Sequence, residues 1–148
     1  MEPALSPPVD TVVRTVASVF AELNTGLLIY HLADPDDPDS LTLVYANAAA
    51  SKYTGADLDT LIGKTIHEAF PGLRDSHLPA TYAEVSAGGK SVNLGAFEYE
   101  GDQHVKPGYF AVKAFPMPAR CVGVVFENIT LRKKVDEFLK REKRGERG

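Results

Sequence analysis

The sequence lacks the features that mark several common classes of protein. Cys121 is the only cysteine among 148 residues, so neither an internal disulfide nor a cysteine cluster for zinc can form. No apolar run approaches the roughly 20 residues of a membrane-spanning helix. The first residues, which include Glu2 and Asp10, do not have the basic and apolar regions of a signal peptide. We therefore expect a cytoplasmic protein with no membrane partner.

Catalytic motifs are missing as well. The sequence contains no Gly-x-Ser-x-Gly nucleophile elbow, no phosphate-binding Gly-Lys loop and no His-Glu-x-x-His metal motif. Its four histidines, His31, His67, His77 and His104, form no metal cluster with acidic residues at ligand spacing. The sequence therefore predicts a protein that is not an enzyme.

Charge is distributed unevenly around a net value of −4. Residues 130–148 hold eight basic and four acidic side chains, whereas residues 1–129 hold eight basic and sixteen acidic ones. An acidic body argues against nucleic-acid binding, because phosphate contacts need a basic face. The basic stretch from Lys140 to Arg147 could contact anionic partners, although a solvated helix end explains it more simply.

An apolar stripe predicts a helix near the N-terminus. Asp10 is expected to cap this helix, and Asn24-Thr25-Gly26 to end it. Its apolar residues recur at steps of three and four, at Val12, Val16, Val19, Phe20 and Leu23. Such a stripe has to be buried, either against the body of this chain or against the same helix of a second copy.

Five later segments have the composition of strands, and 44% hydrophobic residues suffice for the core of one domain. The first two, Gly26 to Leu32 and Leu41 to Ala46, are separated by eight residues, which fits a hairpin with an enlarged loop. The last three, Ser91 to Tyr99, Tyr109 to Met117 and Arg120 to Ile129, are joined by short turns. They predict an antiparallel meander.

A block of short helices lies between the second and third strands. The predicted helices run over Ala48 to Tyr53 after an Asn47 cap, Asp57 to Leu61, Lys64 to Phe70, and His77 or Pro79 to Ala87. Their apolar residues are too numerous for loops, so the block must pack on the sheet. The expected fold is therefore α+β: a five-stranded antiparallel sheet with short helices on one face, plus N-terminal and C-terminal helices.

The last strand runs directly into a helix. Thr130 is a candidate N-cap, with its hydroxyl accepting a hydrogen bond from an amide of the first turn. Leu131, Val135, Phe138 and Glu142 then follow at the alternating spacing of a heptad seam, which is too short for an independent coiled coil. The helix is thus predicted to dock onto a neighbour or to begin a longer coiled coil.

This order of elements, together with three local motifs, resembles the PAS sensory-domain family. The motifs are Leu43 to Ala49, which is similar to the family's second strand and Asn-capped helix, Ile62 to Pro71, similar to its central helix, and Val122 to Lys134, similar to its final strand and exit. The resemblance implies three parts: a lead-in and helix over 1–24, a sensor domain over 25–130 and a signalling helix or linker over 131–148.

The resemblance also implies a cavity between the sheet and the short helices. The candidate lining residues are Ile29, Tyr45, Tyr53, Ile66, Phe70, Leu78, Tyr82, Phe97, Phe110, Val112 and Val124, although packing in the core is the simpler explanation for any one of them. The family uses such cavities for flavin, haem, a small metabolite or nothing. Flavin-adduct photochemistry is not expected, because the central helix has no cysteine. Haem would need His77, or next His67, as its ligand.

The signal is expected to leave the domain at Asn128, Ile129 and Thr130, where the family usually has Asp-Ile-Thr. Asn keeps the hydrogen-bonding capacity of Asp and loses its charge, so coupling by hydrogen bonds is expected here. The sequence therefore predicts a non-enzymatic sensor that binds a small ligand or a partner, forms a homodimer through its terminal helices and relays to an effector such as a histidine kinase. The alternatives are a haem-binding gas or redox sensor and a ligand-free dimerisation module.

Overall fold

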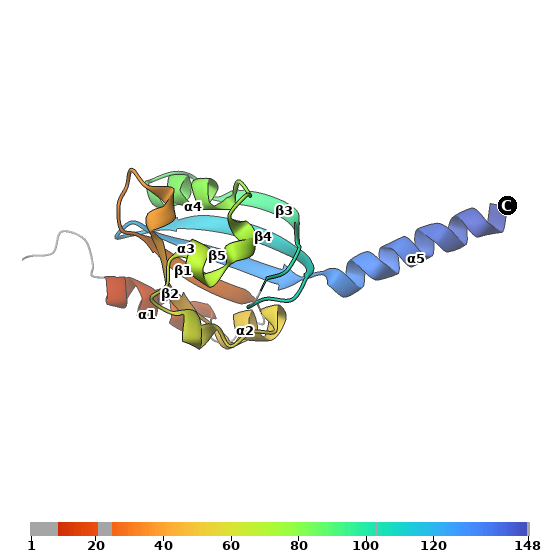
Figure 1. Ribbon diagram of the computed structural model, residues 1–148, viewed down its shortest axis with the longest axis horizontal. Helices are drawn as coiled ribbons and strands as arrows, with labels where there is room; N and C mark the ends of the chain where they lie inside the picture. Colours follow the sequence, from red (N-terminus) through yellow and green to blue (C-terminus); the bar gives the residue numbers. More distant parts are fainter. Residues whose placement is uncertain (1–8, 21–24, 103, 148) are drawn as a thin grey trace, which may run out of the picture.

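The structure of the protein is a computed structural model that describes residues 9–20, 25–102 and 104–147. Its centre is a five-stranded antiparallel sheet with the order β2-β1-β5-β4-β3 (Figure 1). The strands are β1 (Gly26–Leu32), β2 (Leu41–Ala46), β3 (Val92–Tyr99), β4 (Gly108–Met117) and β5 (Cys121–Asn128). The predicted hairpin and meander are both confirmed, and no strand end differs from its predicted position by more than one residue.

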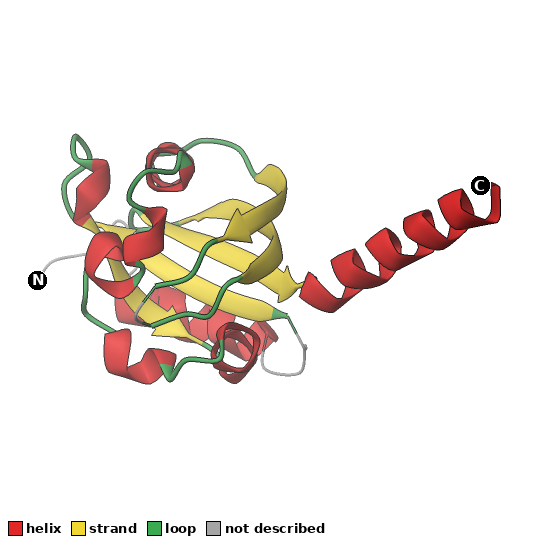
Figure 2. Ribbon diagram, turned by 45° about the vertical axis from the view of Figure 1, so that its right-hand side comes forward, coloured by secondary structure: helices red, strands yellow, loops and turns green. Residues whose placement is uncertain are grey.

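Short helices cover one face of the sheet (Figure 2). They are η1 (Pro38–Ser40), α2 (Ala48–Thr54), η2 (Leu58–Leu61), α3 (Ile66–Ala69), η3 (Pro71–Leu73) and α4 (Leu78–Ser86). Asn47 caps α2 by accepting a hydrogen bond from the Ala50 amide, and Gly55 ends it in the left-handed conformation. The helix predicted from Lys64 begins only at Ile66, because Thr65 and Glu68 form a capping box there.

The opposite face of the sheet packs against helix α1 (Val9–Phe20). Val12 is buried there with Leu27 and Ile29 of β1. The Phe20 ring stacks on Phe115 of β4, with 6.2 Å between ring centroids. The predicted apolar stripe therefore packs on the chain's own sheet, except for the exposed Val19. Leu23, which was predicted to belong to the same stripe, lies outside the described residues.

Helix α5 (Thr130–Arg147) leaves the end of β5 and extends away from the sheet (Figure 1). Its apolar side chains Leu131, Val135, Phe138 and Leu139 are exposed. No helix among the described residues is long and apolar enough to cross a membrane.

Candidate functional site

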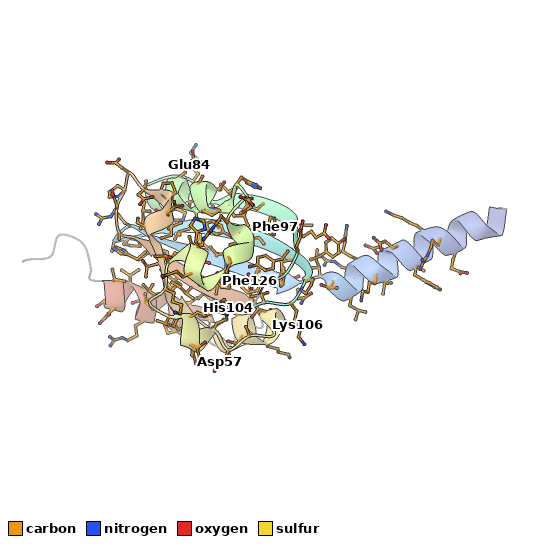
Figure 3. All side chains as sticks on the ribbon, viewed as in Figure 1. Asp57, Glu84, Phe97, His104, Lys106 and Phe126 are labelled. Atoms are coloured by element: carbon orange, nitrogen blue, oxygen red, sulfur yellow. The ribbon has the colours of Figure 1, made fainter. Side chains whose placement is uncertain are left out.

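A cavity lies between the sheet and the helices that cover its first face. It has a volume of about 70 Å³, which is room for several water molecules or a small organic group. Figure 3 labels two of its aromatic residues, Phe97 of β3 and Phe126 of β5. The full lining consists of apolar and hydroxyl-bearing side chains: Leu28, Tyr30, Thr54, Phe70, Leu73, Leu78, Tyr82, Phe97, Tyr99, Val105, Phe110, Val112, Val124 and Phe126.

The structure brings most of the predicted lining residues to this cavity. Seven of them line it: Phe70, Leu78, Tyr82, Phe97, Phe110, Val112 and Val124. Ile66 is fully buried in the same core without lining the cavity. Tyr53 packs at the border of this core, where its ring meets the edge of the Phe126 ring. Whether these residues bind a ligand stays a prediction.

Two of the predicted lining residues lie on the face of the sheet opposite the cavity. Ile29 and Tyr45, which lie opposite each other in the β1–β2 ladder, both belong to the core under α1. Successive side chains of a strand point to opposite faces, so the neighbours Leu28 and Tyr30 line the cavity instead. The sequence carries no signal for this choice, because β1 is buried on both faces and its apolar run does not alternate.

Tyr30 and Tyr82 are two of the four hydroxyl-bearing residues of the lining, beside Thr54 and Tyr99. Their rings stack with 5.7 Å between centroids, and their exposed fractions are 1% and 3%. Burial raises the pKa of the Tyr82 hydroxyl. Burial also raises the pKa of Tyr30, and the nearby Tyr82 and Tyr99 raise it further. Both hydroxyls are therefore neutral at physiological pH and available as hydrogen-bond donors.

A third tyrosine, Tyr99, is fixed by Asp102. Its hydroxyl donates to Asp102 Oδ2, which also accepts from the Gly72 amide at 3.1 Å. The other carboxylate oxygen, Oδ1, accepts from the amides of His104 at 2.7 Å and Val105 at 2.9 Å. Asp102 thereby joins η3, the end of β3 and the following loop, and it holds the buried Val105 against the cavity.

The environment of Asp102 favours its charged form. Partial burial opposes ionisation, but the hydrogen bonds from Tyr99, His104, Val105 and Gly72 outweigh it and lower the pKa of this carboxyl. Burial raises the pKa of Tyr99, and its hydrogen bond to the carboxylate of Asp102 raises it further. Asp102 therefore acts as the acceptor in this pair, and Tyr99 as the donor.

The wall of the cavity contacts the joint between β5 and α5 through Phe126 and Tyr53. Phe126 lines the cavity and meets Phe110 and Tyr53 edge to face, at centroid distances of 5.7 and 6.4 Å. Two residues later, Asn128 Nδ2 donates to the carbonyl of Tyr53 at 2.9 Å, and Asn128 Oδ1 accepts from the Thr130 amide at 3.0 Å. The side chain at the end of β5, just before the exit helix, is thus hydrogen-bonded to Tyr53, which packs beside the cavity wall.

The rest of the joint is anchored on β4. Ile129 is buried, and its amide donates to the Tyr109 carbonyl at 2.8 Å. The prediction that Thr130 caps the first turn is wrong, because Thr130 is the first residue of α5 and its hydroxyl accepts from the Tyr109 amide at 2.9 Å. Lys133 Nζ then lies 5.3 Å from the centre of the Tyr109 ring. Hydrogen bonds and packing therefore fix the direction in which α5 leaves the domain.

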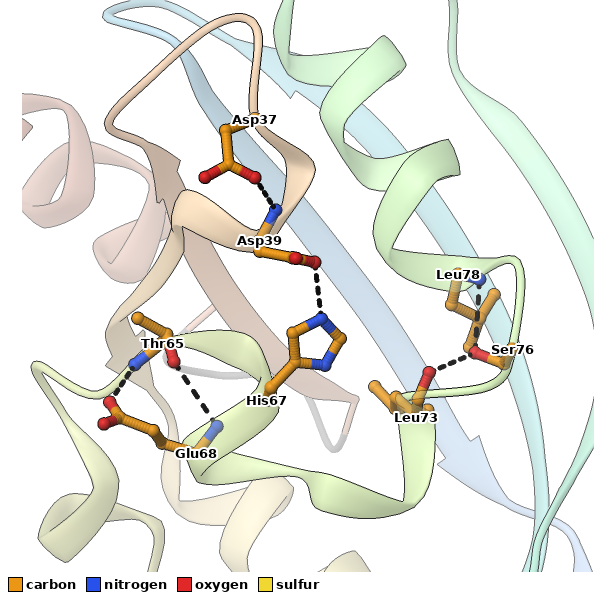
Figure 4. A network of polar contacts seen from close by, with 8 residues as sticks. All are labelled: Asp37, Asp39, Thr65, His67, Glu68, Leu73, Ser76 and Leu78. Carbon is orange, nitrogen blue, oxygen red and sulfur yellow. Dashed lines mark hydrogen bonds and ion pairs between the residues drawn. The ribbon is translucent and has the colours of Figure 1, made fainter.

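The candidate haem ligands do not reach the cavity. His67 lies on α3, where its Nε2 is 2.6 Å from Asp39 Oδ1 (Figure 4) and its Nδ1 is buried without a hydrogen bond. His77 is exposed and precedes α4. No histidine is among the described residues that line the cavity, and the described chain contains no group of three side chains that could hold a metal ion. Neither His67 nor His77 is therefore placed to bind the iron of a haem in this cavity.

The only cysteine lies on the other side of the sheet. Cys121 is buried under α1, 3.7 Å from His31 Nδ1. Burial raises the pKa of its thiol to about 11, although Arg120 acts in the opposite direction. The thiol is therefore protonated and inert, and it does not face the cavity.

A five-stranded antiparallel sheet with a helix-covered cavity and an exit helix is the architecture of a sensory domain. The model of the family described as PAS fold matches residues 37–134, and the chain therefore belongs to this family. Among curated proteins, no sequence matches the chain significantly.

Solved structures show the same fold at low sequence identity. An RNA-binding light-oxygen-voltage receptor is 15% identical, with a TM-score of 0.59, over 99% of this chain and 41% of that receptor. The chain therefore spans about two fifths of the receptor's length. An RsLOV d2 variant is 15% identical, with a TM-score of 0.57, over 80% of this chain and 67% of that protein.

A third structure comes from a kinase. The photoactive yellow protein domain of the sensor histidine kinase Ppr from Rhodospirillum centenum is 13% identical, with a TM-score of 0.53, over 80% of this chain and 97% of that domain. At this level of identity these likenesses establish the fold alone.

Proposed function

We propose that this PAS domain senses a small molecule bound in the cavity. Binding changes the position of α5, which signals to an effector such as a histidine kinase. One observation carries the proposal: Phe126 lines the cavity, and Asn128, on the same face of the same strand, bonds both the neighbouring Tyr53 and the first residue of α5. A ligand that moves the Phe126 ring would therefore shift the origin of α5. The proposal assigns no catalytic reaction to the chain.

The structural relationship to a domain of a sensor histidine kinase supports the choice of effector. The proposed mechanism is a shift in population between two positions of α5, which requires the ligand to bind one of them more tightly. The uncharged Asn128 couples the two parts by hydrogen bonds, so its effect is expected to depend little on salt.

Co-purification tests the ligand. Mass spectrometry of the denatured wild-type chain should detect a bound small molecule, and Val112→Phe, which fills the cavity from β4, should abolish it. Val125→Phe on the opposite face is the matched control and should retain the molecule. If the wild-type chain and the Val112→Phe variant carry the same molecules in the same amounts, the cavity is not the sensing site.

A second candidate function is dimerisation through α5. Leu131, Val135 and Phe138 share one heptad seam and are 74%, 47% and 51% exposed. Such a seam is self-complementary, so a second copy of the chain is its simplest partner. The mass from light scattering should fall from dimer toward monomer in Phe138→Ala, more than in the control Leu139→Ala, an equally exposed residue outside the seam. A monomeric wild-type chain would refute this role.

A further inference from the structure

The cavity contains two buried hydroxyls that the protein leaves without partners. No hydrogen bond of the described residues involves the hydroxyl of Tyr30 or Tyr82, whereas the third tyrosine, Tyr99, donates to Asp102. Within the described chain, the only polar side-chain atom that has neither accessible surface nor a hydrogen bond is His67 Nδ1. The two tyrosine hydroxyls therefore keep some accessible surface, and we infer that this surface faces the cavity that both residues line.

A buried hydroxyl without a partner is costly. Such a group loses its hydrogen bonds to water and gains none in return, and natural cores rarely contain two such groups side by side. A phenylalanine at either position would fill the same space without this cost. The pair is thus explained by an acceptor atom that enters the cavity from outside the chain.

The rest of the lining restricts the ligand further. Half of the fourteen lining residues are Phe or Tyr, which favours an aromatic ring packed by edge or offset contacts. None of the described lining residues carries a charge, so a carboxylate or an ammonium group would lose its hydration without compensation. The cavity of about 70 Å³ excludes a large cofactor, and a single ring with one small substituent enters it only when lining side chains such as Phe126 move apart, which is the movement that the proposed function requires.

We propose that the cavity binds a small uncharged aromatic molecule whose carbonyl-type oxygen accepts hydrogen bonds from the hydroxyls of Tyr30 and Tyr82. This inference rests on the proposed sensory function and names the class of ligand at the same site. The aromatic ring lies among the phenylalanines of the sheet, and the oxygen lies against the stacked tyrosine pair. The side chains that set ligand specificity are therefore Tyr30 and Tyr82.

Three probes of nearly equal shape test the proposal by calorimetry on the full chain at pH 7. Acetophenone offers the oxygen, α-methylstyrene replaces that oxygen with a methylene group, and benzoate replaces the methyl group with a charged oxygen. Acetophenone should bind the wild-type chain about 2- to 10-fold more tightly than α-methylstyrene, the range expected for one hydrogen bond. Benzoate should bind at least about 100-fold more weakly than acetophenone, because its charge would be buried unpaired.

Variants assign the effect to the hydroxyls. Tyr30→Phe and Tyr82→Phe should each weaken acetophenone binding by about 2- to 10-fold and leave α-methylstyrene binding unchanged. Tyr45→Phe makes the same chemical change on the opposite face and should affect neither probe. The comparison of the three probes on the wild-type chain needs no variant and remains decisive if a variant does not fold.

The outcomes separate this inference from the proposed function. Equal affinities for acetophenone and α-methylstyrene in the wild-type chain, unchanged in Tyr30→Phe and Tyr82→Phe, would leave ligand binding intact and overturn the role of the tyrosines. Binding of none of the three probes would overturn the ligand class, while the molecule found by co-purification would still test sensing. Tighter binding of benzoate would also overturn the proposal.

Discussion

Both faces of the sheet contain fully buried side chains, but they differ in how much they bury and in what buries them. Under α1, Leu27, Ile29 and Cys121 are fully buried among apolar neighbours. Under the short helices, a cavity remains, and hydroxyl groups line part of it. Burial alone therefore does not distinguish a binding face from a packing face. The distinguishing features are the apolar cavity, the unpartnered hydroxyls and the contacts from the cavity wall to the start of α5.

The largest expected effect comes from a substitution on the face that packs against α1. Ile29→Ala should lower the free energy of unfolding by about 2–5 kcal/mol, because Ile29 is fully buried and the deletion leaves a void. Urea denaturation measures this loss. The affinity of the folded variant for acetophenone should not change, since Ile29 faces away from the cavity. A shift in affinity as large as that of Tyr82→Phe would remove the distinction between the faces.

Tyr99→Phe should have the next largest effect. It removes a hydrogen bond to the charged Asp102, which is expected to lower the free energy of unfolding by about 1–3 kcal/mol at pH 7. Because the folded state lowers the pKa of Asp102, this stabilisation is complete above the ordinary carboxyl pKa and is lost as the pH falls below about 4.

Denaturation at a series of pH values checks the sign of this effect. The difference between wild type and Tyr99→Phe should shrink as the pH falls through the lowered pKa of Asp102. A difference that stays constant from pH 7 to pH 2 would show that the bond to the carboxylate is not its source. Asp102→Asn provides the control, because it should remove most of the pH dependence from this site.

Asn128→Ala tests whether the cavity face continues into α5. The change removes hydrogen bonds to the Tyr53 carbonyl and from the Thr130 amide, and it should cost about 1 kcal/mol. Hydrogen exchange should become faster in the first turn of α5. The matched control is Glu127→Ala, since Glu127 is exposed on the same strand and faces the opposite side. Equal effects of the two variants would argue against a specific joint.

The smallest expected loss of stability concerns Tyr82→Phe in the absence of added ligand. Its hydroxyl has no protein partner among the described residues, so the free energy of unfolding should not fall and should rise as the cost of the unpaired hydroxyl is removed. This result would contrast with that of Tyr99→Phe on the same face. A loss above about 1 kcal/mol would mean that the protein itself satisfies the hydroxyl.

Much of the fold follows from local sequence signals. The strand ends, the Asn47 cap and the Gly55 stop depend on residues close together in the chain, and such signals are readable without the structure. The cavity residues of β4 were also predictable, since Phe110 and Val112 lie on the face of the strand opposite to that of the charged Lys113. Such alternation identifies the face that packs on the helices.

Other features depend on contacts that the sequence does not display. The strand β1 is buried on both faces, so its apolar run has no alternation. The pattern alone therefore could not decide whether Ile29 or Tyr30 faces the cavity. The hydroxyl of Thr130 bonds the amide of Tyr109, a partner on a neighbouring strand, and not a nearby amide of its own helix. Long-range partners of this kind appear only when the strands are assembled.

A methyl-resolved NMR titration of the full chain with acetophenone tests the central claim most directly. The adjacent residues Leu27 and Leu28 face opposite sides of the same strand, so they report on the two faces with the same chemistry. The account predicts saturable shifts for the methyl groups of Leu28, Val112 and Val124, and unchanged positions for those of Leu27 and Ile29. Shifts confined to Leu27 and Ile29, or equal on both faces, would contradict it.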